Sequence, residues 1–325
     1  MSARVAVVGA GAWGTALANV AAEASGSLVP LIGRDREEMT EIAERRVNAR
    51  RLPGVRLNRS VLPTDDLATL VGARFVLVVT PTQTLRDVAA AIRPHLGSRA
   101  VVVACCKGVE RGSLALPHAV LAEALPGVPG ALLSGPSFAD DVARGLPTAV
   151  TLAAADEDVA GAAATALATR SFRPYRSTDV AGVALGGAAK NVLAIAAGVV
   201  EGAGLGESAA AALIARGFAE LARLGSALGA RPETLSGLSG LGDLVLTATS
   251  EKSRNFSLGL ALGRGAPRPE KLAEGAATAG ALVALARGHD VEMPISAAVA
   301  EVVDGRLSVA EAIERLLARP LRAEA

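Results

Sequence analysis

The chain has 325 residues, is 51% hydrophobic but only 2% aromatic, and carries 33 basic and 32 acidic residues for a formal net charge of +1. The length predicts two domains with ample chain to bury a core, and the composition builds that core from Ala, Val and Leu. The balanced charge gives no support to nucleic-acid or membrane-surface binding. The sequence has no metal-ligand spacing of His and Cys, so no metal is expected.

The two cysteines, Cys105 and Cys106, are adjacent in a predicted strand. Successive strand side chains point to opposite faces, so the two thiols are not expected to pair. Free cysteines fit a reduced, cytoplasmic location. The chain enters its first predicted strand within a few residues of its start, which leaves no room for a signal peptide.

A glycine-rich turn follows the first predicted strand, 4–8, and leads into a helix predicted over 15–23. Gly9, Gly11 and Gly14 form a Gly-x-Gly-x-x-Gly motif between strand and helix, which is typical of dinucleotide binding. The first glycine allows the tight turn, the second lets backbone approach a diphosphate, and the third lets helix pack on strand. A glycine-rich turn without a ligand is the alternative. The predicted cofactor contacts in this turn are Gly9, Gly11, Ala12, Trp13 and Gly14.

The second predicted strand, 27–32, is followed, after one glycine, by Arg34 and Asp35. An acid about 20 residues beyond the motif usually holds the ribose 2′-hydroxyl of NAD, and an arginine there suits the 2′-phosphate of NADP. Arg34 stands at that point, so we predict that NADPH is used at least as well as NADH. Asp35 either caps the helix predicted over 36–47, which we favour, or reaches the ribose. Trp13, the only tryptophan, either walls the cofactor site or is an ordinary packing residue.

Further strands are predicted over 74–79, 99–105, 131–133, 147–153 and 171–175. Lys107 follows the second of these at the carboxyl edge, where open α/β sheets bind ligands. We therefore expect Lys107 in the same crevice as the nicotinamide rather than in a solvated loop. The segment 134–139 is a Gly-Pro turn with hydroxyls ahead of a short helix, and it is either an anion cradle or simply a capped turn.

After Asp179 the pattern becomes helical throughout. Alternating strands and helices followed by helices alone predict the α/β class with two domains. The first, residues 1–179, is a Rossmann-type dinucleotide-binding domain. The second, residues 180–325, is an all-α substrate domain.

Lys190 lies near the middle of an apolar run, 180–200, that is long enough to resemble a membrane span. The central lysine and the dominance of Gly and Ala argue against a span, so we predict a core helix surrounded by protein. Only four of the 33 basic residues are lysines, namely Lys107, Lys190, Lys252 and Lys271. Burial lowers the pKa of an amine toward neutrality, and lysine, unlike arginine, can then exchange a proton. Lys190 is therefore a candidate acid–base group, with a structural lysine as the alternative.

Two polar sites interrupt the later helices. Asp243 lies in the otherwise apolar segment 238–244, where a buried acid needs a partner, and Lys190 is the available cation. Ser253, Arg254 and Asn255 gather a hydroxyl, a guanidinium and an amide, a set that suits a phosphate or carboxylate on a small substrate. A solvated turn is the alternative for this second group.

These motifs together resemble the bacterial NAD(P)-dependent sn-glycerol-3-phosphate dehydrogenases, over essentially the whole chain. The motifs that carry the resemblance are Gly-Ala-Gly-Ala-Trp-Gly-Thr-Ala-Leu-Ala (9–18), Ser-Gly-Pro-Ser-Phe-Ala (134–139), Gly-Gly-Ala-Ala-Lys-Asn (186–191), Gly-Leu-Gly-Asp-Leu (240–244) and Ser-Arg-Asn (253–255). Several positions depart from the family pattern. Arg51 stands where an aromatic is usual, Cys106 precedes Lys107 where Thr or Ser is common, Ala12 and Trp13 replace the residues of some relatives, and the segment around Glu274 is looser.

The resemblance implies a set of site residues. Lys190 matches the proton donor and acceptor of the family. The positions that match substrate contacts are Lys107, Gly135, Ser137, Lys190, Asp243, Ser253, Arg254 and Asn255. The positions that match cofactor contacts are Trp13, Arg34, Lys107, Ala139, Arg254 and Glu274.

The expected reaction interconverts dihydroxyacetone phosphate and sn-glycerol 3-phosphate with NAD(P)H, which supplies glycerol phosphate for phospholipid synthesis. In this hypothesis Lys190 protonates the C2 oxygen as hydride arrives, and Asp243 orients Lys190. The alternatives are a related two-domain dehydrogenase for another small hydroxy acid and a non-catalytic NAD(P)H sensor. The expected partner is a phosphorylated triose, without nucleic acid or a membrane span, and the large apolar helical domain favours a homodimer.

Overall fold

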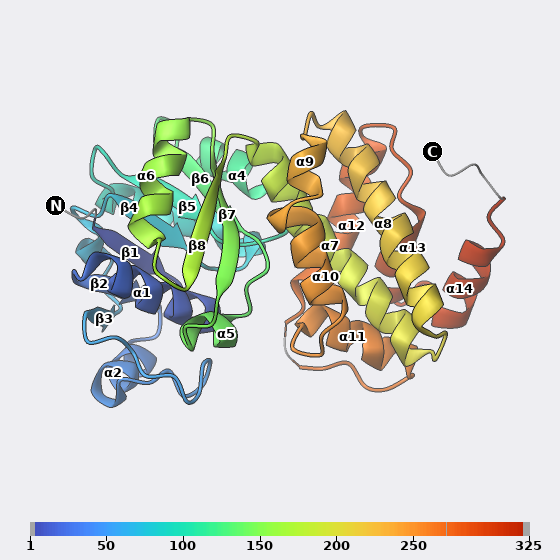
Figure 1. Ribbon diagram of the computed structural model, residues 1–325, viewed down its shortest axis with the longest axis horizontal. Helices are drawn as coiled ribbons and strands as arrows, with labels where there is room; N and C mark the ends of the chain where they lie inside the picture. Colours follow the sequence, from blue (N-terminus) through green and yellow to red (C-terminus); the bar gives the residue numbers. More distant parts are fainter. Residues whose placement is uncertain (1–3, 271, 321–325) are drawn as a thin grey trace.

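The computed structural model describes residues 4–270 and 272–320. An eight-stranded sheet forms the centre of its N-terminal lobe (Figure 1). The strands are β1 (Val5–Val8), β2 (Val29–Ile32), β3 (Val61–Thr64), β4 (Phe75–Val78), β5 (Val101–Ala104), β6 (Gly130–Ser134), β7 (Thr148–Ala154) and β8 (Phe172–Ser177). Their order is β3-β2-β1-β4-β5-β6-β7-β8. Strands β1 to β6 run parallel, whereas β7 is antiparallel to β6 and β8 is parallel to β7. Lys271, residues 1–3 of the first predicted domain and residues 321–325 of the second lie outside the described residues.

Helices cover both faces of this sheet. They are α1 (Ala12–Ser25), α2 (Arg36–Arg45), α3 (Leu85–Ile92), α4 (Pro117–Ala124), α5 (Ala139–Ala143) and α6 (Glu157–Leu167), with short 3-10 turns at Leu67–Leu70, Thr82–Thr84 and Arg93–His95. Strands β1, β2, β4 and β5 are buried along their whole length, as expected for parallel strands that are covered on both sides. The predicted α/β class is therefore confirmed.

The two faces of the sheet have separate cores, and the adjacent cysteines lie on different ones. Cys105 packs with the core under α1 and α6, and Cys106 packs with the core under α3 and α4. Both thiols are free and buried, but they lie just beyond the end of β5 and not, as was predicted, in the strand. The core on the Cys106 side continues into the helical lobe, so the two lobes share apolar packing.

Strand β3 is an element that the sequence did not reveal. It has only four residues, includes Pro63, and lies at one edge of the sheet. Proline lacks a backbone N–H and is therefore confined largely to edge strands. Because the strand is short and contains a proline, its hydrophobic pattern does not predict it.

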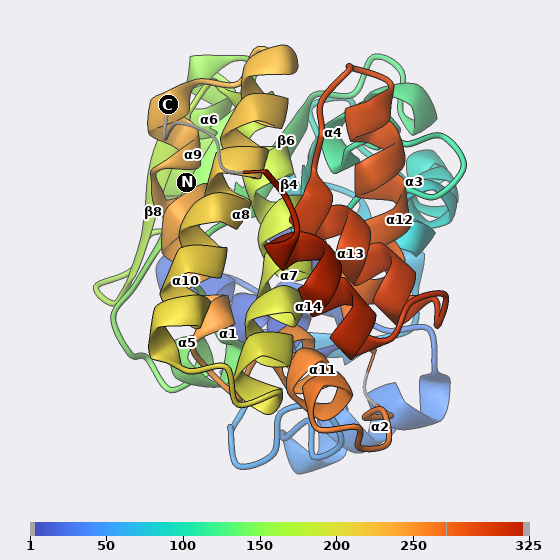
Figure 2. The same cartoon turned by 90° about the vertical axis from the view of Figure 1, so that its right-hand side faces the viewer.

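The C-terminal lobe consists of helices around α7 (Val180–Gly202), which Figure 2 views from the helical side. The others are α8 (Glu207–Ala227), α9 (Pro232–Leu235), a π-helical turn η4 (Leu238–Gly242), α10 (Asp243–Ala248), α11 (Arg254–Gly263), α12 (Glu274–Arg287), α13 (Pro294–Val303) and α14 (Val309–Leu317). Helix α7 is long and apolar enough to cross a membrane, but 94% of its apolar window is buried in protein. It is the core helix that the sequence predicts.

Glycines allow α7 and α11 to pack with their backbones in contact. A Cβ on Gly198 would lie 2.2 Å from the carbonyl oxygen of Phe256, and one on Gly259 would lie 2.0 Å from that of Ile195. Both positions have ordinary helical backbone, so closeness rather than torsion requires glycine there. Helix α11 therefore lies directly against the helix that carries Lys190.

Candidate active site

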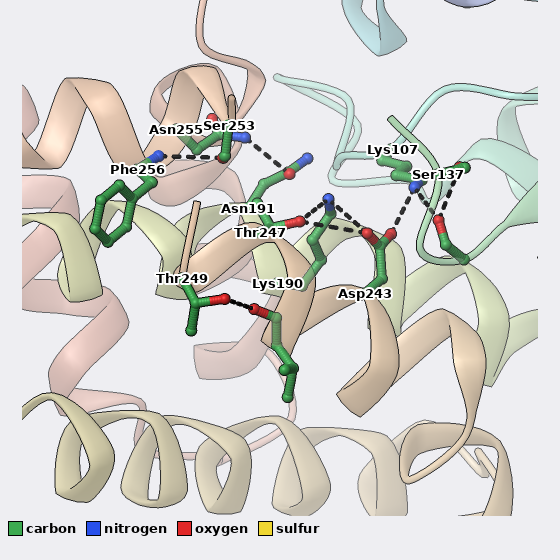
Figure 3. A network of polar contacts seen from close by, with 12 residues as sticks. Lys107, Ser137, Lys190, Asn191, Asp243, Thr247, Thr249, Ser253, Asn255 and Phe256 are labelled. Carbon is green, nitrogen blue, oxygen red and sulfur yellow. Dashed lines mark hydrogen bonds and ion pairs between the residues drawn. The ribbon is translucent and has the colours of Figure 1, made fainter. Parts of the chain in front are cut away.

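Lys190 and Lys107 approach the same carboxylate from the two lobes (Figure 3). Lys190 Nζ donates to Asp243 Oδ1 at 3.0 Å, and Lys107 Nζ donates to Asp243 Oδ2 at 2.5 Å. Lys190 is 7% exposed and Asp243 is 1% exposed. The sequence predicted the Lys190–Asp243 pair and placed Lys107 at the crevice, and the structure brings all three together.

Burial controls the charge states of this group. It lowers the pKa of Lys190 to about 8, with the Asp243 carboxylate acting against the shift and the Lys107 ammonium adding to it. Burial alone would raise the pKa of Asp243, but the charges of Lys107 and Lys190 outweigh it and hold that pKa below its usual value. Asp243 therefore stays ionised at neutral pH, while Lys190 can gain or lose a proton there.

Thr247 completes the surroundings of the Lys190 amine, and the sequence analysis did not identify it. Lys190 Nζ donates to Thr247 Oγ1 at 2.7 Å, and Thr247 Oγ1 donates to Asp243 Oδ1 at 3.3 Å. Thr247 is 2% exposed. It follows Asp243 by four residues, so both lie on one face of α10. That spacing was the available signal, but threonine is too common in helices for it to stand out.

Lys107 reaches this site from the carboxyl end of β5. Its Nζ also donates to the carbonyl oxygen of Gly135 at 3.0 Å, in the turn after β6 where Ser137 Oγ donates to the same oxygen. Its side chain passes α7 at Gly187, where an added Cβ would lie 3.3 Å from Lys107 Cγ. The predicted substrate residues Lys107, Gly135 and Ser137 are therefore grouped on the N-terminal side of Asp243.

The Ser253-Arg254-Asn255 segment begins α11, and two of its side chains have structural partners. Ser253 Oγ accepts from the backbone N–H of Phe256 as the N-cap. Asn255 donates to Asn191 Oδ1 at 2.8 Å and accepts from the N–H of Gly275 at 2.9 Å. The Arg254 side chain, in contrast, is exposed. Arg254 is thus the member of this segment that can reach an anion without losing a structural bond.

Two predicted cofactor contacts are the first residues of helices. Ala139 is the first residue of α5 and Glu274 is the first residue of α12. Burial raises the pKa of Glu274, while the charges of Arg254, Lys107 and Lys190 act in the opposite direction. Glu274 therefore belongs spatially to the Lys107–Asp243–Lys190 group, although it comes from a loosely matching segment.

The glycine-rich turn fits a dinucleotide. A Cβ on Gly14 would lie 1.8 Å from the carbonyl oxygen of Gly9, so the helix sits directly on the turn, whereas a Cβ on Gly11 would meet nothing within 4 Å. The N-cap of α1 is Gly11, which has no side chain to bond the free N–H groups of the first turn. That turn also contains no acidic residue. Open backbone and uncapped N–H groups are what a diphosphate needs.

The neighbouring predictions have mixed outcomes. Asp35 caps α2 by accepting from the N–H of Glu38, as favoured. Arg34 is exposed beside it. Trp13 packs near Phe172, with ring centroids 6.5 Å apart, so ordinary packing accounts for at least part of its role. No group of three or more His, Cys, Asp or Glu among residues 4–270 and 272–320 is arranged to hold a metal ion.

Comparisons with known proteins agree with this arrangement. A family model described as NAD-dependent glycerol-3-phosphate dehydrogenase N-terminus matches residues 4–160, and its C-terminus counterpart matches residues 179–314. The chain is 59% identical to the glycerol-3-phosphate dehydrogenase (NAD(P)+) of Azorhizobium caulinodans, over 99% of this chain and 98% of that protein. It is 58% identical to the protein of the same name from Bradyrhizobium diazoefficiens, over 98% of each.

Solved structures give the same result. The glycerol-3-phosphate dehydrogenase of Coxiella burnetii is 38% identical and superposes with a TM-score of 0.92, over 98% of this chain and 99% of that one. A ketopantoate reductase from Ralstonia eutropha, 19% identical with a TM-score of 0.59 over 93% of this chain and 99% of that one, shares the fold alone. The chain belongs to the NAD-dependent glycerol-3-phosphate dehydrogenase family.

Proposed function

We propose that the protein interconverts dihydroxyacetone phosphate and sn-glycerol 3-phosphate with NADPH or NADH, and that Lys190 exchanges the proton. The observation that carries this proposal is the Lys190 amine, which is buried, bonded to Asp243 and Thr247, and has a pKa of about 8. An amine that is poised near neutral pH can act as acid in one direction and base in the other.

The roles within the site follow from the contacts. Lys190, in its ammonium form, donates a hydrogen bond to the C2 carbonyl oxygen and transfers a proton to it as that oxygen gains charge. In the reverse direction the neutral amine takes the proton from the C2 hydroxyl. Asp243 and Thr247 fix the direction of Nζ, and Asp243 stays charged throughout. A bound nicotinamide cofactor supplies or accepts the hydride.

Substrate binding is assigned to the cations and hydroxyls around this amine. Arg254 pairs with the phosphate, helped by Ser253 and Asn255 at the start of α11. The remaining substrate contacts are Lys107, Gly135, Ser137, Lys190 and Asp243. Arginine suits this role because its planar fork can make two parallel bonds to phosphate oxygens.

Cofactor binding is assigned to the glycine-rich turn and to six further positions. Gly9, Gly11, Ala12 and Gly14 hold the diphosphate at the N-terminus of α1. The further contacts are Trp13, Arg34, Lys107, Ala139, Arg254 and Glu274. Because Arg34 is exposed at the end of β2, we propose that NADPH is used at least as well as NADH.

The setting of the enzyme is also proposed. The product supplies phospholipid synthesis, the location is the cytoplasm, and the protein is a homodimer. The division into domains at 179 and 180 is supported by Asp179, whose carboxylate accepts from the N–H of Gly182 and caps α7.

The test is NADPH oxidation by the purified protein with dihydroxyacetone phosphate as the sole substrate, followed by absorbance. Lys190→Ala should lower turnover by about 10²- to 10⁴-fold, the usual contribution of general acid–base catalysis. Near-normal turnover in this variant would remove the assignment of Lys190. A wild-type protein that binds NADPH but does not oxidise it with this substrate would favour the sensor alternative.

A further inference from the structure

Lys252 is a lysine that the proposed reaction does not use. It lies in the loop between α10 and α11 and precedes Ser253 directly. Its Nζ donates to Asp141 Oδ1 at 2.9 Å, and it lies 6.0 Å from the centroid of the Phe138 ring. Both partners belong to the other lobe, where Phe138 is the N-cap of α5 and Asp141 lies in its first turn.

These contacts join the α10–α11 loop of the helical lobe to α5 of the N-terminal lobe. On the N-terminal side, Phe138 follows Ser137 and precedes Ala139, and both neighbours are proposed ligand contacts. On the helical side, Lys252 is two residues from Arg254. Figure 1 shows α5 on the side of the N-terminal lobe that faces α10 and α11. A single side chain therefore connects the segment that would hold the phosphate to the segment that would line the cofactor.

The Lys252–Asp141 pair differs in exposure from the Lys107–Asp243 pair, which also joins the two lobes. The side chains of Lys252 and Asp141 are 57% and 32% exposed, whereas those of Lys107 and Asp243 are 15% and 2% exposed. An exposed ion pair is weak because water competes with it, although the aromatic face adds attraction for the ammonium. A weak contact of this kind can form when the lobes meet and break again when product leaves.

We propose that Lys252 is a positioning residue that holds the α10–α11 loop against α5, and thereby sets Arg254 at the substrate phosphate. This inference rests on the proposed phosphate-binding role of Arg254. The ion pair contributes to the bound state and makes no contact with the reacting atoms. Losing it should therefore weaken substrate binding and leave the chemical step unchanged.

The experiment compares steady-state kinetics of full-length variants with NADPH and dihydroxyacetone phosphate. Lys252→Ala should raise KM for dihydroxyacetone phosphate by about two- to fivefold, the range that an exposed ion pair can supply, with kcat within about twofold of wild type. Lys252→Arg should keep the wild-type KM. The double variant Lys252→Asp with Asp141→Lys should recover at least half of the loss in KM.

The matched control is Asp140→Asn on the same short helix. Asp140 pairs with Arg144 within the N-terminal lobe, at 2.9 Å and with 62% and 38% exposure of Arg144 and Asp140. Removing that pair should leave KM unchanged. Thermal unfolding of every variant should match wild type, because the contacts concerned are exposed.

Three results would overturn the inference: an unchanged KM in Lys252→Ala, an equal rise in Asp140→Asn, or a fall in kcat without a rise in KM. The outcome is separate from the fate of the proposed function. A wild-type protein without activity toward dihydroxyacetone phosphate removes the function itself. An active wild type whose Lys252→Ala variant keeps its KM removes only the role of Lys252.

Discussion

Asp243 holds Lys190 by one carboxylate oxygen, at 3.0 Å, and Lys107 by the other, at 2.5 Å. One buried negative charge is therefore shared between the buried amine of Lys190 and the partly buried amine of Lys107, which come from different lobes. With both amines protonated the group has an excess positive charge, which burial disfavours. Release of a proton from Lys190 relieves that excess. The same arrangement thus ties the lobes together and makes Lys190 the group that titrates.

The two directions of the reaction should have opposite pH dependence. In the proposed mechanism, reduction of dihydroxyacetone phosphate needs Lys190 protonated, so kcat/KM should fall as pH rises through about 8, the pKa of Lys190. Oxidation of glycerol 3-phosphate needs the neutral amine, so kcat/KM should rise through the same pH. Initial rates in both directions across this range give the two profiles.

The variant Asp243→Asn tests what sets the pH at which these two profiles change. The Asp243 charge acts to raise the pKa of Lys190, so its removal should move both profiles to lower pH. Asp304→Asn removes an exposed carboxylate that pairs with Arg306 and should leave the profiles in place. Profiles that stay unchanged in Asp243→Asn would mean that another group sets the midpoint.

Thr247→Val should lower kcat by about tenfold. The substitution keeps the shape of the side chain but removes the hydroxyl that accepts from Lys190 at 2.7 Å, and an unmet buried hydrogen bond costs about 1–3 kcal/mol. Thr249→Val is the matched control, because Thr249 at the C-cap of the same helix donates to the carbonyl oxygen of Val245 and is exposed (Figure 3). Equal losses in both variants would show that the helix, and not the amine contact, is responsible.

Arg34→Ala should lower the preference for NADPH over NADH. The guanidinium stands at the end of β2, where a 2′-phosphate would lie, and no acid of the same turn competes for it, since Asp35 caps α2. The ratio of kcat/KM for the two cofactors measures the change, and KM for dihydroxyacetone phosphate serves as the internal control. An unchanged ratio would mean that Arg34 does not contact the 2′-phosphate.

The sequence predicted those parts of the site in which local pattern and chemistry coincide. Lys190 was identifiable because it is one of only four lysines and lies in a long apolar run, and Lys107 because it follows a buried strand. Thr247 was missed because its role depends on a contact with α7 that is distant in sequence. Strand β3 was missed because it is short and contains Pro63. Strand β7 was predicted, but its antiparallel pairing with β6 was not, since strand direction is set by tertiary packing. The Lys252–Asp141 contact likewise spans the two lobes, and no short-range pattern records it.

Gly259→Ala should destabilise the protein by about 1–3 kcal/mol, the usual cost of overpacking. The added methyl would lie 2.0 Å from the carbonyl oxygen of Ile195, so α11 would have to move away from α7. Gly280→Ala is the control, because Gly280 lies in α12 with nothing within 4 Å of an added Cβ, and alanine is the better helix former by about 1 kcal/mol. Thermal or urea unfolding should therefore show opposite shifts for the two variants. Since α7 carries Lys190, the Gly259→Ala variant should also lose activity below its unfolding temperature. If both substitutions stabilised the protein, the α7–α11 contact would tolerate a side chain at Gly259.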